Sequence, residues 1–147
     1  MTLSVQNLQT QLKQLRLVET SEVIPKLLRE AETSSWTYME FLTAVLSYEE
    51  QRREEKLIER HLKWAQLPFQ KGLDTFDVNE LPSLSMKQLN QLKEMTWLDE
   101  NYNLIFLGPS GVGKTHLSVA LGLEAIYNKQ RVAFVTMGEL IPLLKTE

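Results

Sequence analysis

The chain has no cysteine among its 147 residues. This absence excludes a disulfide framework and a thiolate metal site, and it fits a reducing compartment such as the cytoplasm, where we expect the protein. Long apolar runs are also missing, because stretches such as 104–107 and 132–135 are far too short to span a bilayer. Met1 is followed by polar, glutamine-rich sequence, so we expect neither a secretory signal nor a membrane partner.

A strong excess of charge of either sign is lacking as well. The formal net charge is −3, so charge alone does not indicate nucleic-acid binding. We interpret the charged segment 49–63 as a solvated, salt-bridged helix face rather than a nucleic-acid patch, since phosphate binding needs excess positive charge. Its basic and acidic side chains balance: Arg52, Arg53, Lys56, Arg60 and Lys63 against Glu49, Glu50, Glu54, Glu55 and Glu59. The remaining composition, 43% apolar and 24% charged, is ordinary for one globular domain.

The first part of the sequence predicts helices. Apolar residues recur at helical spacing over 4–17 and again over 22–33, and a break is predicted between them at 18–21. Pro25 falls in the first turn of the second helix, where a missing N–H is harmless. These two segments therefore read as a helical pair.

A capping box marks the start of a third helix. Thr37 is followed three residues later by Glu40, so a helix should begin at Tyr38. Good helix formers carry it through the charged segment until Pro68 ends it. We therefore assign residues 1–69 to an N-terminal helical domain.

The second half of the sequence predicts an α/β arrangement. Residues 70–102 read as a linker and a helix leading into a core, with a capping box at Ser85 and Gln88. Residues 103–147 read as a partial P-loop core of strand, P-loop, helix, strand and partial helix. The predicted segments are 103–107, 108–115, 116–128, 131–136 and a final helix opened by Thr136 and Glu139.

Residues 108–115 carry the most specific motif in the chain. They read G-x-x-x-x-G-K-T, the phosphate-binding P-loop or Walker A motif, and they stand between a predicted strand and a predicted helix, as the motif requires. A chance glycine turn before a helix would not explain the Lys-Thr pair. We predict that the nucleotide-binding residues are Gly108, Pro109, Ser110, Gly111, Val112, Gly113, Lys114 and Thr115.

The chemistry of a bound nucleotide explains this spacing. Glycines allow positive φ and bring backbone N–H groups close to the phosphates, while the following helix points its positive end at the same place. Lys114 is predicted to reach the β- and γ-phosphates of ATP. The Thr115 hydroxyl is predicted to ligate Mg²⁺.

The sequence resembles the IstB-like helper ATPases of insertion-sequence transposons, relatives of DnaC-type helicase loaders. The residues that carry the resemblance are 14–17, 38–42, 49–53, 62–68, 73–77, 103–117 and Val135. The resemblance implies an AAA+ core preceded by a small helical domain. It also implies ATP-loaded subunits that self-assemble on double-stranded DNA and recruit or stimulate the transposase of the same element.

The sequence departs from that family at its C-terminal end. The second acidic motif, the sensor and the arginine finger of the family are missing, so we expect a C-terminally truncated form and assign no catalytic residue. Beyond Thr136 the one acidic candidate before Glu147 is Glu139, at a helix start. His61 and His116 have no partner at metal-ligand spacing, so we expect surface or packing roles. Whether this chain is an ATPase therefore stays open.

The truncation carries an expectation about folding. The strands that separate the P-loop strand from the next strand in an AAA+ sheet are missing, so the P-loop strand should have unpaired backbone edges. We expect stable N-terminal helices and a marginal segment 103–147. Three alternatives stay open for function: a DnaC-like helicase loader in replication, a small P-loop kinase, and a non-catalytic interaction module with a vestigial nucleotide site.

Overall fold

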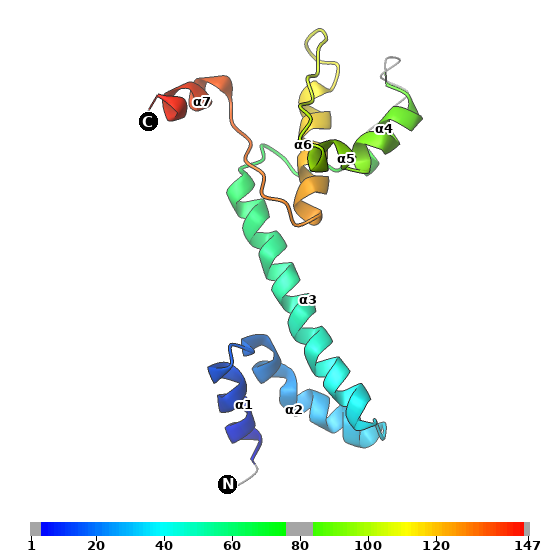
Figure 1. Ribbon diagram of the computed structural model, residues 1–147, viewed down its shortest axis with the longest axis vertical. Coiled ribbons are helices and arrows are strands. Elements are labelled where there is room, and N and C mark those ends of the chain that lie inside the picture. The colour runs from blue at the N-terminus through cyan, green and yellow to red at the C-terminus, as the bar shows by residue number, and fades with distance from the viewer. Residues whose placement is uncertain (1–3, 76–83, 146–147) are drawn as a thin grey trace. The chain divides into compact units, whose positions relative to one another are not determined.

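The computed structural model describes residues 4–75 and 84–145. The chain forms two compact units, Met1–Leu57 and Ile58–Glu147, which we call the N-terminal unit and the C-terminal unit (Figure 1). Part of the predicted linker and helix segment 70–102, residues 76–83, lies outside the described residues. Among the helices of the described ranges, none combines the length and apolar character needed to cross a membrane.

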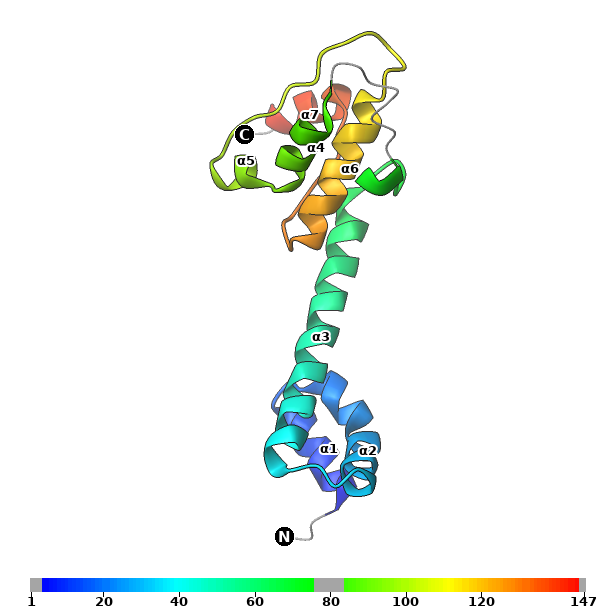
Figure 2. The ribbon, with the colours of Figure 1, turned by 90° about the vertical axis from the view of Figure 1, so that its right-hand side faces the viewer.

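The N-terminal unit is built from two short helices and the beginning of a long one. α1 spans Val5–Gln14, α2 spans Val18–Thr33, and α3 spans Tyr38–Ala65, continuing beyond this unit. Figure 2 shows α1 and α2 packed side by side. Leu12, Ile24, Leu27 and Val45, one or two from each helix, form the buried cluster that joins them. Leu12, Leu27 and Val45 belong to the apolar stripes predicted from the sequence, whereas Ile24 was not predicted to face the core. Burial of one face of each helix stabilises the unit.

The predicted break at 18–21 is wrong, because these residues form the first turn of α2. The N-cap residue, Leu17, offers no side-chain cap to that turn. A carboxylate from α3 takes its place: Glu49 Oε2 accepts from the backbone N–H and the hydroxyl of Thr20, both at 2.8 Å. An acceptor 29 residues away thus supplies what a local capping residue normally supplies.

The predicted start of α3 is confirmed. Glu40 donates its N–H to Thr37 Oγ1 at 3.2 Å, and its carboxylate accepts from the Thr37 N–H at 2.7 Å. The predicted pair of Glu49 and Arg53 also forms, whereas Lys56 pairs with Glu19 and not with the predicted Glu59. Arg53 pairs with Glu49 at 2.8 Å, and further pairs join Arg52 with Glu19 and Glu55 and Lys56 with Glu19. Three of the five basic residues of segment 49–63, namely Arg52, Arg53 and Lys56, are therefore paired with carboxylates.

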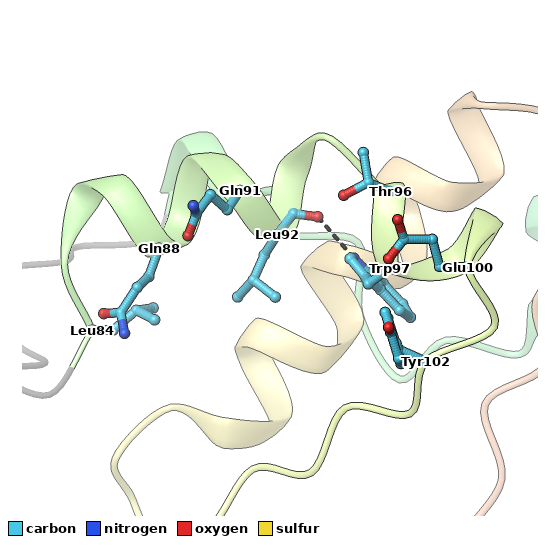
Figure 3. A pocket seen from close by; sticks show the side chains of 8 residues that line it. All are labelled: Leu84, Gln88, Gln91, Leu92, Thr96, Trp97, Glu100 and Tyr102. Carbon is cyan, nitrogen blue, oxygen red and sulfur yellow. Dashed lines mark hydrogen bonds between the residues drawn. The ribbon is translucent and has the colours of Figure 1, made fainter.

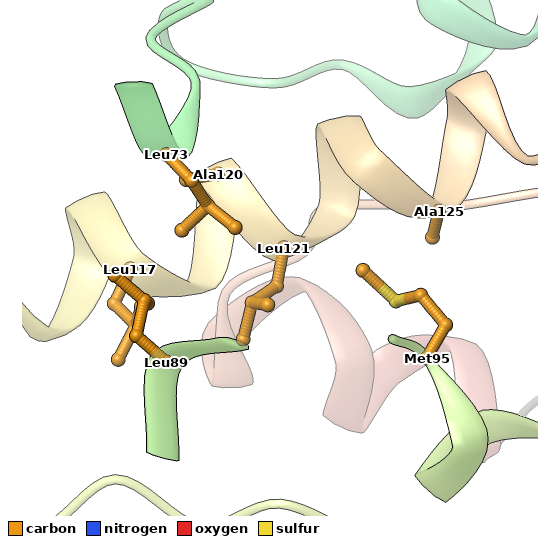
Figure 4. Packing of buried hydrophobic residues seen from close by; sticks show 7 residues of the cluster. All are labelled: Leu73, Leu89, Met95, Leu117, Ala120, Leu121 and Ala125. Atoms are coloured by element: carbon orange, nitrogen blue, oxygen red, sulfur yellow. The ribbon is translucent and has the colours of Figure 1, made fainter. Parts of the chain in front are cut away.

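The C-terminal unit is organised around one buried helix. α6 spans Lys114–Tyr127, and its buried residues lie all round it (Leu117, Val119, Ala120, Leu121, Leu123, Ala125 and Ile126). A helix that is apolar on every side must be covered on every side. Figure 4 shows part of that cover, with Leu89 and Met95 facing Leu117, Leu121 and Ala125.

Shorter elements complete this unit. They are η1 (Leu73–Thr75), α4 (Met86–Lys93), α5 (Thr96–Asp99) and α7 (Met137–Leu144). The predicted capping boxes are confirmed at the starts of α4 and α7, where Ser85 and Thr136 bond reciprocally with Gln88 and Glu139. Each cap needs only residues three positions apart, which explains why the sequence shows it clearly.

The predicted α/β fold is wrong, since the described residues form helices and contain no strand. The segments 103–107 and 131–135 do show period-2 burial. Leu104 and Phe106 pack on the cluster around α6, whereas Ile105 and Leu107 are 79% and 90% exposed. A β-strand, however, is defined by backbone hydrogen bonds to a neighbouring strand. The Phe134 N–H donates instead to the carbonyl of Ala65 at the end of α3, at 2.8 Å. The apolar alternation is present, but neither segment has a strand partner within the described ranges.

Candidate phosphate-binding site

Two glycines give the loop between residue 107 and α6 its shape. Gly111 and Gly113 have φ angles of 81° and 86°, in the left-handed region that side chains with a Cβ avoid. A Cβ placed on Gly111 would meet no atom within 4 Å, so the requirement there is conformational and not steric crowding. Gly113, a glycine that the motif requires, and Gly111, at one of its variable positions, therefore allow a turn that most other residues would strain.

The same loop delivers the chain into α6. Gly113 is the N-cap residue of this helix, and it brings no side-chain oxygen to the first-turn N–H groups. The first N–H groups of a helix have no partner within it, and the helix dipole adds partial positive charge at this end. The loop and the helix start together form a polar surface suited to an anion.

Lys114, the first residue of α6, crosses the loop with its side chain. Its ammonium donates to the carbonyl of Gly108 at 2.8 Å and to the carbonyl of Pro109. No carboxylate of residues 4–75 or 84–145 forms an ion pair with it. No carboxylate of the described residues therefore neutralises the charge of Lys114, and its ammonium lies against the carbonyls of Gly108 and Pro109 in the glycine loop.

A pocket of about 370 Å³ opens beside the loop. Its volume falls in the range of pockets that hold small ligands, roughly 300–1,000 Å³. The walls are mostly apolar with one ammonium group, and the lining residues are Leu84, Ile105, Phe106, Leu107, Val112, Gly113, Lys114 and Leu117. An apolar wall next to a cation can accommodate a ligand that has both a flat organic part and a negatively charged part.

The other predicted site residues lie around this pocket without lining it. Ser110 and Thr115 are exposed, and Thr115 occupies the second position of α6. The structure therefore brings Val112, Gly113 and Lys114 together at one pocket and leaves Ser110 and Thr115 exposed outside its lining. No group of three or more His, Asp or Glu side chains suited to a metal ion exists within the described part of the chain.

His116 ties the start of α6 to the segment that follows α3. Its Nε2 lies 3.3 Å from Thr75 Oγ1, and its ring meets the ring of Phe69 edge-on, with centroids 6.0 Å apart at 82°. The packing role expected for this histidine is thus observed, but its partners could not be read from the sequence because 41 residues separate it from Thr75. These contacts position the first turn of α6.

Comparisons with known proteins agree on one family. A family model described as IstB-like ATP binding protein matches residues 10–147. The chain is 36% identical over 137 residues to the "Insertion sequence IS21 putative ATP-binding protein" of Pseudomonas aeruginosa, covering 93% of this chain and 52% of that protein. It is 35% identical over 135 residues to an IS21-like counterpart of Bacteroides fragilis, covering 92% and 51%.

A third relative gives the same picture. The counterpart from insertion sequence IS5376 of Geobacillus stearothermophilus is 35% identical over 115 residues, covering 78% of this chain and 46% of that protein. The chain thus spans about half the length of the curated relatives it matches. The matched part includes the glycine loop, Lys114 and α6.

Proposed function

Because the chain belongs to the family of IstB-like ATP-binding proteins, we propose that residues 108–115 bind the phosphate groups of ATP. The observation that carries this proposal is the position of Lys114, whose ammonium lies across the glycine loop and is held there by two carbonyls. A phosphate oxygen is a stronger partner for an ammonium than a neutral carbonyl is, because both groups are then charged. Phosphate binding would therefore replace bonds that Lys114 already makes within the loop.

Each part of the loop has a role in this proposal. Gly111 and Gly113 let the backbone N–H groups approach the phosphates, and the start of α6 adds a favourable dipole. Lys114 supplies the full positive charge. The apolar walls formed by Phe106, Val112 and Leu117 would exclude water and strengthen these interactions.

Few groups of this chain could bind Mg²⁺ beside the nucleotide. Thr115 offers a hydroxyl in the first turn of α6, beside Lys114. Magnesium usually binds through one or two carboxylates together with substrate phosphates, and it would neutralise phosphate charge when bound. The wall of the pocket carries no carboxylate. We therefore propose the hydroxyl of Thr115 as the protein ligand of Mg²⁺. The proposal covers nucleotide binding and does not extend to ATP hydrolysis.

Nucleotide binding is tested by fluorescence titration of the chain with a fluorescent ATP analogue and Mg²⁺. Lys114→Ala removes charge-assisted contacts worth about 1.5–3 kcal/mol, so affinity should fall roughly 10- to 150-fold. Lys87→Ala is the matched control, because Lys87 is an exposed lysine of α4 outside the pocket. Unmeasurable binding by the wild-type chain, or equal affinity of the two variants, would refute the proposal.

We further propose a role as an ATP-binding helper of DNA transposition, in which ATP-loaded copies assemble on double-stranded DNA and recruit or stimulate a transposase. The support is the description of the relatives as ATP-binding proteins of insertion sequences. The test is co-purification of the chain with the transposase of the same element, with and without ATP and target DNA. If neither the transposase nor the target DNA binds the chain under any of these conditions, this role is contradicted.

One observation favours a second candidate, a non-catalytic interaction module. The pocket beside the loop presents an ammonium but no carboxylate, so the group that positions water in an ATPase is not identified there. The same titration separates the two candidates. A chain that binds its transposase but not ATP would support the interaction module alone.

A further inference from the structure

A second pocket, of about 380 Å³, lies between α4, α5 and Tyr102 (Figure 3). It shares no residue with the glycine loop. Two aromatic rings and one carboxylate line it, from Trp97, Tyr102 and Glu100. We propose that this pocket binds an arginine side chain presented by a protein partner.

The aromatic part of the pocket is held in place by hydrogen bonds. The indole N–H of Trp97 donates to the carbonyl of Leu92 at 3.0 Å, which fixes the orientation of the ring. The backbone N–H of Tyr102 donates to the carbonyl of Trp97 at 2.8 Å, which keeps the two residues together. Figure 3 shows the two side chains next to each other. A fixed ring face attracts a cation without a further ordering cost.

Glu100 provides the charge. Figure 3 shows its side chain beside that of Trp97. Its carboxylate has no hydrogen-bond or ion-pair partner in the ranges that the structure describes. Among the described residues, Glu100 is the only charged residue that lines the pocket. This local charge attracts a cation and disfavours a nucleic-acid phosphate.

An arginine fits these groups better than a lysine. A guanidinium is planar, so it can stack on the indole of Trp97 while it donates two parallel hydrogen bonds to the carboxylate of Glu100. The pocket is larger than one side chain and continues past Leu92 towards Leu84. A polypeptide segment with an apolar residue next to its arginine would fill it, whereas free arginine would not.

The experiment uses the full chain and two capped tripeptides, acetyl-Leu-Arg-Leu-amide and its citrulline analogue. Citrulline has nearly the same shape as arginine but no charge. NMR titration follows the indole N–H signal of Trp97, and calorimetry measures affinity. The arginine peptide should shift that signal and bind at least about tenfold more tightly than the citrulline peptide, as expected for a charge-assisted pair.

Two variants locate the effect. Glu100→Gln should reduce affinity for the arginine peptide to the level of the citrulline peptide. Asp99→Asn is the matched control, because Asp99 lies one residue away and does not line the pocket, and it should leave affinity unchanged. Equal binding of the two peptides, equal loss in both variants, or a shift of the Trp97 signal by a single-stranded oligonucleotide instead would overturn the proposal. No ATP is added to these titrations, so the result is independent of ATP binding.

Discussion

Replacement of Glu49 should destabilise the N-terminal unit more than any other single change of charge there. The residue is 4% exposed, and Oε2 accepts two hydrogen bonds of 2.8 Å from Thr20. Oε1 pairs with Arg53 Nε at 2.8 Å. Arg53 also donates to the carbonyl of Arg16, so one carboxylate connects the start of α2, the loop before it and α3.

The magnitude follows from what each substitution leaves behind. Glu49→Ala removes the acceptor of the buried Thr20 N–H and hydroxyl, and an unsatisfied buried polar group costs about 1–3 kcal/mol. Arg53 is half exposed, so water can solvate its guanidinium group once Glu49 is removed. The loss of this ion pair therefore adds little to the destabilisation. We expect Glu49→Ala to lower the free energy of unfolding by about 3 kcal/mol. Glu49→Gln keeps a neutral acceptor, so we expect about half of that loss.

Urea unfolding followed by far-UV circular dichroism and by Trp36 fluorescence measures these losses. Trp36 lies in the N-terminal unit, whereas Trp64 and Trp97 lie in the C-terminal unit. The matched control is Glu50→Ala, because Glu50 is exposed and directly follows Glu49. If both alanine variants unfold at the same urea concentration, the capping of α2 by Glu49 does not stabilise the unit.

The pH dependence supplies a second readout. Burial raises the pKa of Glu49, but the hydrogen bonds from Thr20 and the interaction with Arg53 outweigh it and hold the pKa below the ordinary value of 4.5. A carboxyl with a lowered folded-state pKa stabilises the fold fully above its unfolded-state pKa, and this contribution is lost as the pH falls through the folded-state pKa. Wild-type stability should therefore fall below about pH 4.5, and Glu49→Gln should lack this part of the loss. An unchanged acid profile in Glu49→Gln would argue against the lowered pKa.

Four other predictions follow from the structure. Amides of 104–107 should exchange rapidly with solvent, because the described residues give this segment no ladder; strong protection would contradict this. Gly111→Ala should weaken ATP binding and cost about 1–2 kcal/mol through its positive φ, as seen by titration and thermal unfolding. Thr136→Ala should reduce helicity at α7 in NMR chemical shifts, since a lost N-cap costs about 1 kcal/mol. His61→Leu should raise the melting temperature, because it removes a buried Nδ1 that has no partner in the described structure.

The sequence determined the local features of this protein. The spacing of Gly108 and Lys114, the capping boxes at Thr37, Ser85 and Thr136, and the apolar stripes of the helices each involve residues only a few positions apart. Their physical causes act within one turn or loop, so they can be read without knowledge of the fold. The resemblance to IstB-like proteins belongs here as well, because it rests on residues in sequence order.

The tertiary structure decided what depends on distant partners. Residues 103–107 have the period of a strand, but a strand also needs a neighbouring strand, and α6 is what they pack against instead. The start of α2 could not be predicted, because its capping acceptor, Glu49, comes from another helix. The pairing of His116 with Thr75 and the pocket around Trp97 and Glu100 have the same origin. Each joins groups that only folding brings together, and no periodicity in the sequence records such a contact.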